Sequence, residues 1–207
     1  QLNATRYHHF DASGIAGGEI FLDGGINGSI LASSSFDASA AEQAGGSIAM
    51  TASRISLLSA DLAADGVTAG GTVFVGGEWQ GSGSLRWASK TAINRDTQLS
   101  AQATAGDGGT IVVWSEDLTL FDGSAYAQGS GQGGKVEISS LGDFAYNGEV
   151  TVGPGGEVLF DPKNITIATA AGTAATWKRL INWWSAPAGT PMINSDTDSF
   201  GEALAIE

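Results

Sequence analysis

The 207-residue sequence contains no cysteine, four prolines and only nine lysines and arginines. The lack of cysteine excludes disulfide scaffolds, thiolate metal sites and cysteine nucleophiles. The scarcity of proline beside 31 glycines excludes collagen-like and proline-rich disordered chains. The 22 acidic residues give a formal net charge of −13, which excludes nucleic acid and disfavours anionic membrane surfaces as partners because both repel it.

Long apolar runs are also lacking, so no membrane-spanning helix is predicted. The sequence has neither an initial methionine nor a signal peptide, and Gln1 begins within the repeat pattern. We therefore interpret it as a fragment or processed segment of a longer protein. Hydrophobic residues make up 42% of the chain, which is enough to form a core.

A glycine pair followed by alternating apolar residues recurs along the chain. The first glycines of the pairs are Gly17, Gly45, Gly70, Gly108, Gly133 and Gly155. They recur about every 25 residues, with one longer interval after Gly70, which is typical of a repeat architecture. The third and fifth residues after each first glycine are apolar, so each pair begins a strand with these positions on one face.

Further short strands are predicted within the repeats, separated by Gly, Asn, Asp and Ser. They cover residues 55–57, 118–120, 144–146, 150–152 and 165–167. About three strands per repeat favour an all-β fold, a right-handed single-stranded parallel β-helix of about seven coils over residues 1–169. We expect the glycine pairs to supply corner conformations, including positive φ.

The middle residue of each glycine-pair strand should point outward. These residues are Phe21, Ala49, Phe74, Val112, Glu137 and Leu159. Because most are large and apolar, something is expected to cover this stripe; scattered surface apolar residues are the alternative. The long interval after Gly70 should hold an extra coil or a loop around residues 87–94.

The repeat pattern ends before residues 170–207. Trp177, Leu180, Ile181 and Trp184 have helical i, i+3, i+4, i+7 spacing, with Thr173 as N-cap. A short amphipathic helix followed by an irregular tail is predicted here. This segment would cap the β-helix, lie along the apolar stripe or mediate assembly.

Several longer motifs carry a resemblance to a known family. They are GGTVFVGGEWQG (residues 70–81), GDGGTIVVWS (106–115), FDG (121–123), GGKVEISS (133–140) and LFDPKNITI (159–167). Together they resemble the repeat region of large bacterial exoproteins of the filamentous-haemagglutinin type. The resemblance covers residues 10–167 and implies a right-handed β-helix at the cell surface. It also implies export by two-partner secretion through an outer-membrane transporter, or as an autotransporter-like passenger.

Enzymatic chemistry finds little support. The basic residues that a β-helix lyase would use are few and dispersed. The nearest carboxylate pair, Asp196 and Asp198, lies in a turn-forming sequence. We therefore expect no catalytic residues and no cofactor.

Metal binding is not expected either. His8 and His9 are adjacent, so on a strand they face opposite sides. Calcium β-rolls need an aspartate pattern that the repeats lack, although Asp61 and Asp65 could bind calcium incidentally.

The sequence contains tryptophans that could bind sugars and sequons that could carry them. Trp79, Trp87, Trp114 and Trp183 could stack on sugars, although packing on loops or the terminal helix is favoured. Glycosylation sequons begin at Asn3, Asn27 and Asn164.

The leading hypothesis is a structural and adhesive segment of an extracellular or surface-exposed exoprotein, acting as a rigid stalk in biofilm or host attachment. The alternatives are a self-associating subunit of an extracellular filament and, least favoured, a carbohydrate-active β-helix enzyme. A host-cell or matrix receptor, or a glycan, would be the partner, and its identity is not readable from the sequence. The expected contact or assembly residues are Phe21, Phe74, Trp114, Trp177, Leu180, Ile181 and Trp184.

Overall fold

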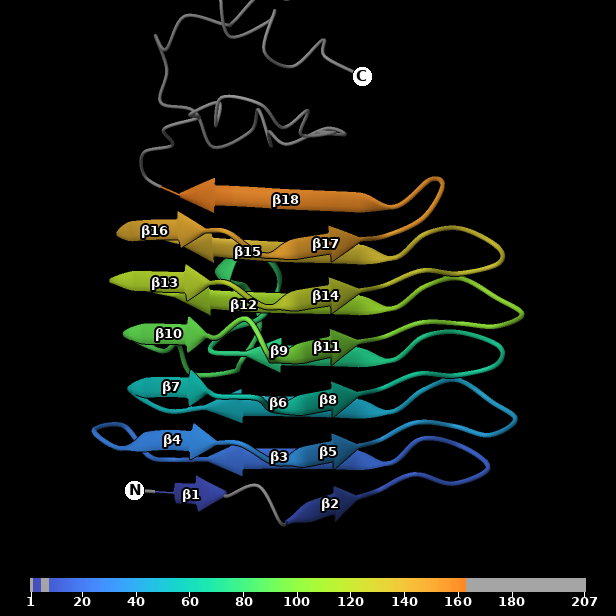
Figure 1. The fold of residues 1–207 in the computed structure, drawn as a ribbon, viewed down its shortest axis with the longest axis horizontal. Coiled ribbons are helices and arrows are strands. Elements are labelled where there is room, and N and C mark those ends of the chain that lie inside the picture. Colours follow the sequence, from blue (N-terminus) through green and yellow to red (C-terminus); the bar gives the residue numbers. More distant parts are fainter. Residues whose placement is uncertain (1, 5–7, 163–207) are drawn as a thin grey trace, which may run out of the picture.

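The computed structural model describes residues 2–4 and 8–162. These residues wind into a parallel β-solenoid in which each full coil contributes one strand to each of three sheets (Figure 1). The first sheet holds β1 (Leu2–Ala4), β4 (Ser29–Ala32), β7 (Arg54–Leu57), β10 (Lys90–Ile93), β13 (Leu118–Phe121) and β16 (Asp143–Tyr146). The second holds β2 (His9–Asp11), β5 (Ser35–Asp37), β8 (Asp61–Ala63), β11 (Gln98–Ser100), β14 (Ser124–Tyr126) and β17 (Glu149–Thr151). The third holds β3 (Glu19–Asp23), β6 (Ser47–Thr51), β9 (Thr72–Val75), β12 (Thr110–Ser115), β15 (Lys135–Ser140) and β18 (Glu157–Pro162).

The predicted all-β parallel β-helix with three strands per coil is confirmed. Each sheet has six strands in the described part of the chain, so about six coils replace the predicted seven. The strand predicted at residues 165–167, the helix around residues 173–184 and the boundary between residues 169 and 170 lie outside the described residues. Among the described residues, no helix is long and apolar enough to cross a membrane.

The core is a set of apolar ladders that run along the solenoid axis. Equivalent residues of successive coils pair in register, as Ile111 does with Val73 on one side and Val136 on the other. All three side chains are fully buried. Since each coil buries its apolar face only against its neighbours, stability depends on continuous stacking.

The glycine pairs are required for close approach of neighbouring coils, and not, as predicted, for corner conformations with positive φ. Positive φ occurs in these pairs only at Gly155, with φ of 74°. A Cβ added at Gly46 or Gly109 would instead lie 2.0 Å from the carbonyl oxygen of the preceding coil, Gly18 and Gly71 respectively. The prediction of left-handed corners is therefore wrong for the other pairs, where glycine lets two coils approach closely.

The long interval after Gly70 contains a loop and no extra coil. The loop, hereafter the covering loop (residues 77–87), leaves the solenoid at Gly76 and returns at Ala88, whose N–H donates to the Gly76 carbonyl over 2.8 Å. It contains the short 3₁₀ turn η1 (Trp79–Gly81). The loop predicted around residues 87–94 was placed too late, because Thr91 and Ile93 are buried in β10.

Candidate contact surface on the third sheet

The outer stripe of the third sheet divides into two halves. Its middle positions pair in register from strand to strand, in the order Phe21, Ala49, Phe74, Val112, Glu137 and Leu159. Phe21 is 55% exposed, whereas Val112 and Glu137 are fully buried and Leu159 is 2% exposed. The expected cover therefore exists over β12 and β15, whereas the described residues leave Phe21 on β3 uncovered.

The covering loop packs on Trp114, which points outward from β12. Trp114 is only 3% exposed, and its ring lies 4.7 Å from that of Trp87 at 45°. Glycine is needed in the loop because a Cβ at Gly77 or Gly81 would lie 3.0 Å from Trp114 atoms. The loop thus closes over an indole that would otherwise be at the surface.

Hydrogen bonds between residues of the covering loop also stabilise its conformation. The Glu78 carboxylate accepts hydrogen bonds from the backbone N–H groups of Ser84 (2.8 Å) and Leu85 (2.7 Å). A carboxylate that accepts two backbone hydrogen bonds stabilises a tight irregular loop. At the edge of the loop, the Lys135 ammonium lies 5.2 Å from the Trp79 ring centroid.

A buried carboxylate joins the loop to the sheet. Glu137 Oε2 accepts a hydrogen bond of 2.6 Å from the backbone N–H of Gln80, while Oε1 has no hydrogen-bond partner among the described residues. Burial raises the pKa of Glu137 to about 7, an effect that the Gln80 hydrogen bond opposes and Asp161 and Glu157 reinforce. Gln80 has φ of 54°, a left-handed conformation that costs a non-glycine residue about 1 kcal/mol. Glu137 therefore helps to hold this unfavourable turn against the sheet.

The uncovered half of the stripe forms a groove of about 390 Å³ beside the covering loop. This feature, hereafter the open groove, is lined by Glu19, Phe21, Asp23, Ala49, Thr51, Phe74, Glu78, Ser84, Leu85 and Arg86. The lining of the open groove thus contains two phenylalanines, three carboxylates and one guanidinium. It is apolar at the sheet and has an excess of negative charge.

Arg86 connects the covering loop to the open groove. Its guanidinium forms an ion pair with Asp23 of β3, and its carbonyl accepts a 2.7 Å hydrogen bond from Thr51 Oγ1. The Gly25 N–H, with a smaller contribution from Arg86, lowers the pKa of the Asp23 carboxyl. Asp23 is therefore ionised at neutral pH, and the pair fixes one wall of the groove.

The structure separates the predicted contact residues. Phe21 and Phe74 meet in the open groove, whereas Trp114 lies apart beneath the covering loop. Trp177, Leu180, Ile181 and Trp184 lie outside the described residues. Sequence reasoning missed the loop residues Glu78, Leu85 and Arg86; the long interval between glycine pairs was the available signal.

Other residues considered from the sequence occupy turns and strand ends. Asp65 Oδ1 accepts hydrogen bonds from Ser100 Oγ (2.5 Å) and the Gln102 N–H (2.6 Å), so this oxygen is already used structurally. Burial raises the pKa of Asp61, and the charges of Asp37 and Asp65 add to the effect. Asn27 is exposed in the turn between β3 and β4, while Asp196, Asp198 and Asn164 lie outside the described residues.

Comparison with known proteins shows a likeness to a solved structure and no match among family models or curated sequences. The fold is similar to the crystal structure of the HMW1 secretion domain from Haemophilus influenzae, with a TM-score of 0.61 and 26% sequence identity. The similarity covers 77% of this chain and 43% of that chain, so this chain spans less than half of that domain.

Proposed function

We propose that this chain is a segment of a large bacterial exoprotein that is exported to the cell surface and acts there as a rigid stalk and contact surface. The observation that carries the proposal is the likeness to the HMW1 secretion domain, in fold and at 26% identity. The filamentous-haemagglutinin-type motifs at residues 70–81 and 106–115 support the same assignment. The first spans β9 and the start of the covering loop, and the second ends in β12.

The stacking of the solenoid supports the role of a stalk. Every strand between the two edges of a sheet is hydrogen-bonded to the preceding and the following coil. The buried ladders continue from Ile20 to Phe160 without a break between coils. Such a quasi-one-dimensional stack resists bending because each coil is held over its whole outline by its neighbours.

Export through an outer-membrane transporter is the step that can be tested first. The full-length gene product should be epitope-tagged in its native cell, and the gene of the two-partner transporter inactivated. We expect protease added to intact cells to remove the tag in the parent strain, and the tag to stay inside the cell without the transporter. A tag that stays cytoplasmic in the parent strain would refute export.

Adhesion is the contact role that fits a surface stalk. The purified chain should bind saturably to a glycan array, to matrix proteins or to host cells. Flat, non-saturable binding on all three would remove adhesion and leave the role of a spacer.

Self-association into a filament is a second candidate, favoured by the open groove. Its two phenylalanines and excess acidic residues complement residues 177–184, where apolar side chains at helical spacing accompany Lys178 and Arg179. The groove lies over β3 to β9, whereas β18, the last strand of the described residues, is at the opposite edge of the third sheet (Figure 1). Docking of residues 177–184 of one copy in the groove of the next would therefore be an open, head-to-tail contact.

The filament candidate is tested by removing either side of this contact. Deletion of residues 173–207, or the double change Phe21→Ser and Phe74→Ser, should convert polymer into monomer in electron micrographs and light scattering. Leu58→Ser, at another exposed apolar position, is the matched control and should leave the polymer intact. Polymer that persists in the deletion variant, or a wild-type chain that stays monomeric at all concentrations, would refute the candidate.

A further inference from the structure

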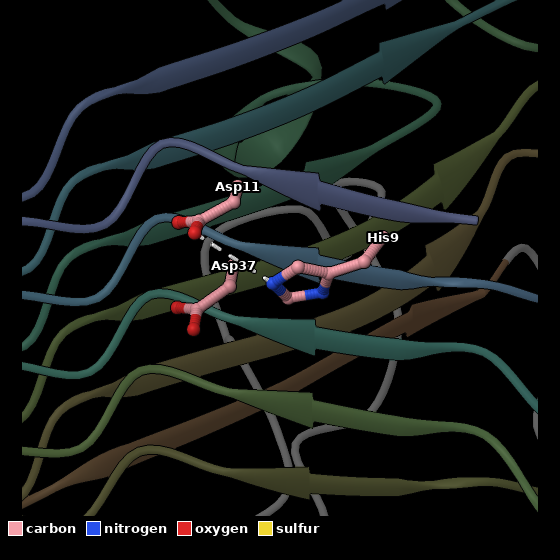
Figure 2. Close-up of side chains that lie close together, drawn as sticks. All are labelled: His9, Asp11 and Asp37. Atoms are coloured by element: carbon pink, nitrogen blue, oxygen red, sulfur yellow. Dashed lines mark ion pairs between the residues drawn. The ribbon is translucent and has the colours of Figure 1, made fainter. Parts of the chain in front are cut away.

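Three side chains with potential metal-ligand atoms lie close together on the outer face of the second sheet, away from the open groove. Figure 2 shows His9 and Asp11 on β2 beside Asp37. His9 and Asp11 are two residues apart and so project from the same face, and Asp11 pairs in register with Asp37 of β5. His9 Nε2 lies 3.9 Å from Asp11 Oδ2, and one ligand atom from each residue lies within 4.8 Å of the other two.

The turns that follow the two strands hold both carboxylates in place. Asp11 Oδ1 accepts hydrogen bonds from the Ser13 N–H (2.9 Å) and Ser13 Oγ (2.6 Å). Asp37 Oδ1 accepts the equivalent hydrogen bond from the Ser39 N–H over 2.9 Å. Each turn thus fixes one carboxylate oxygen and leaves the second oxygen for another ligand.

The electrostatics of this face favour a cation. Asp11 and Asp37 stand on adjacent coils, and Asp61 follows on the third, with its pKa raised by burial and by the charges of Asp37 and Asp65. His9 Nε2 lies 3.9 Å from Asp11 Oδ2, and this contact is an ion pair only when the imidazole is protonated. Like charges at these separations repel one another, and a divalent cation between them would replace repulsion with attraction.

We propose that His9, Asp11 and Asp37 form a binding site for a divalent transition-metal cation, best matched by Zn²⁺. One imidazole nitrogen and two carboxylate oxygens make a donor set that zinc accepts, whereas Ca²⁺ prefers six to eight oxygen ligands. Donor atoms around tetrahedral zinc lie about 3.4 Å apart, so the ligands close in slightly on binding. The His9 side chain is 54% exposed and can rotate to do so.

A bound cation would clamp the first coil to the second. β2 is the edge strand of the second sheet in the described part of the chain, and β5 is its partner there. Cross-linking an edge strand should raise the thermal stability of this end of the solenoid by linkage.

The test uses the full chain, stripped with a chelator and titrated with Zn²⁺ by calorimetry, with melting temperature followed in parallel. We expect one saturable site and a rise in melting temperature, with affinity reduced about tenfold or more by His9→Gln, Asp11→Asn or Asp37→Asn. Asparagine keeps the oxygen that accepts the turn hydrogen bond, so these variants should fold normally. The controls are His8→Gln, the adjacent exposed histidine, and Asp143→Asn, an exposed carboxylate on β16; both should bind as wild type.

Each alternative result refutes the proposal. No saturable binding up to about 1 mM would mean that the three side chains do not form a site. Equal losses in His8→Gln and His9→Gln would indicate general chelation by the histidine pair. Binding of Ca²⁺ as tight as that of Zn²⁺ and insensitive to His9→Gln would indicate an acidic surface without a built site.

Discussion

The two halves of the third sheet's outer face have the same repeat and different surroundings. Over β3, the outward Phe21 is 55% exposed beside the open groove. Over β12 and β15, the outward Val112, Trp114 and Glu137 are buried, with the covering loop packed on Trp114 and bonded to Glu137. The coil geometry does not distinguish these halves, so the burial of an outward side chain is set by an insertion elsewhere in the sequence. Over β3, which the insertion does not reach, Phe21 is exposed among the described residues.

The largest expected loss of unfolding free energy comes from replacing a glycine of the glycine pairs. It should be the same in both halves, because these glycines contact the neighbouring coil in each half. Gly46→Ala below the open groove and Gly109→Ala below the covering loop would each place a Cβ 2.0 Å from a carbonyl oxygen of the neighbouring coil. Each should lower the free energy of unfolding by more than about 4 kcal/mol, measured by urea denaturation followed by circular dichroism.

Gly25→Ala is the control for glycine replacement in general. Gly25 has φ of 85° and no atom within 4 Å of an added Cβ, so its replacement should cost only about 1 kcal/mol. If Gly46→Ala unfolds at the same urea concentration as wild type, the close-approach explanation of the glycine pairs is wrong.

The two halves should differ most clearly in their outward aromatic residues. Trp114→Ala empties a buried site beneath the covering loop and should lower the free energy of unfolding by about 3–5 kcal/mol. Phe21→Ala removes an exposed ring and should change it by about 0.5 kcal/mol or less. Equal values for the two variants, from urea denaturation, would contradict the division of the stripe.

Glu137, in the covered half, should make the free energy of unfolding depend on pH. Its folded pKa is about 7 against an ordinary value of 4.5, so the folded state binds the proton more tightly than the unfolded state. The associated stability is fully present below about pH 4.5 and is lost as pH rises to about 7, in total about 3 kcal/mol. Glu137→Gln should therefore match wild type at pH 4 and be more stable at pH 8, since its amide oxygen can still accept the Gln80 hydrogen bond.

The matched control for Glu137 is Glu19→Gln, at an exposed position in the open groove. Because Glu19 is exposed, this change should alter the free energy of unfolding by about 0.5 kcal/mol or less. An unchanged pH profile in Glu137→Gln would show that the buried carboxylate does not titrate as described.

The smallest change in unfolding free energy is expected for the ion pair between Arg86 of the covering loop and Asp23 of the open groove. Arg86→Gln removes the ion pair with Asp23, in which both side chains are partly exposed, so the unfolding midpoint should not change resolvably. The covering loop should open more often, and thermolysin cleavage near Leu85 should accelerate by about threefold. A cleavage rate equal to wild type would mean that Arg86 does not hold the loop.

The sequence predicted the solenoid because its repeats are regular. Alternating apolar residues after each glycine pair identified the strands of the third sheet, and Ile111 and Val136 indeed face the core. The covering loop could not be placed in the same way, since irregular loops lack periodicity and the signal there was only an unusual interval. The requirement for glycine was recognised, but its cause was not, because contact with the neighbouring coil is a tertiary property.

The candidate site was predicted only in part for the same reason. Phe21 and Phe74 were selected from their outward positions, but the loop that bounds their groove comes from residues 78–86. The sequence analysis considers His9 only together with its neighbour His8 as a metal ligand. In the structure, the potential ligands near His9 are Asp11, two residues further along, and Asp37, in the next coil. A ligand set that crosses coils becomes visible only once the register between the coils is known.

Hydroxyl-radical footprinting read by mass spectrometry tests the division of the outer stripe most directly. Phe21 should be oxidised readily in the monomeric chain, while Trp114 should be protected until the protein unfolds. Covering-loop opening in Arg86→Gln should increase oxidation at Trp114 and leave Phe21 unchanged. Oxidation of Trp114 as fast as that of Phe21 in the folded wild-type chain would contradict the account.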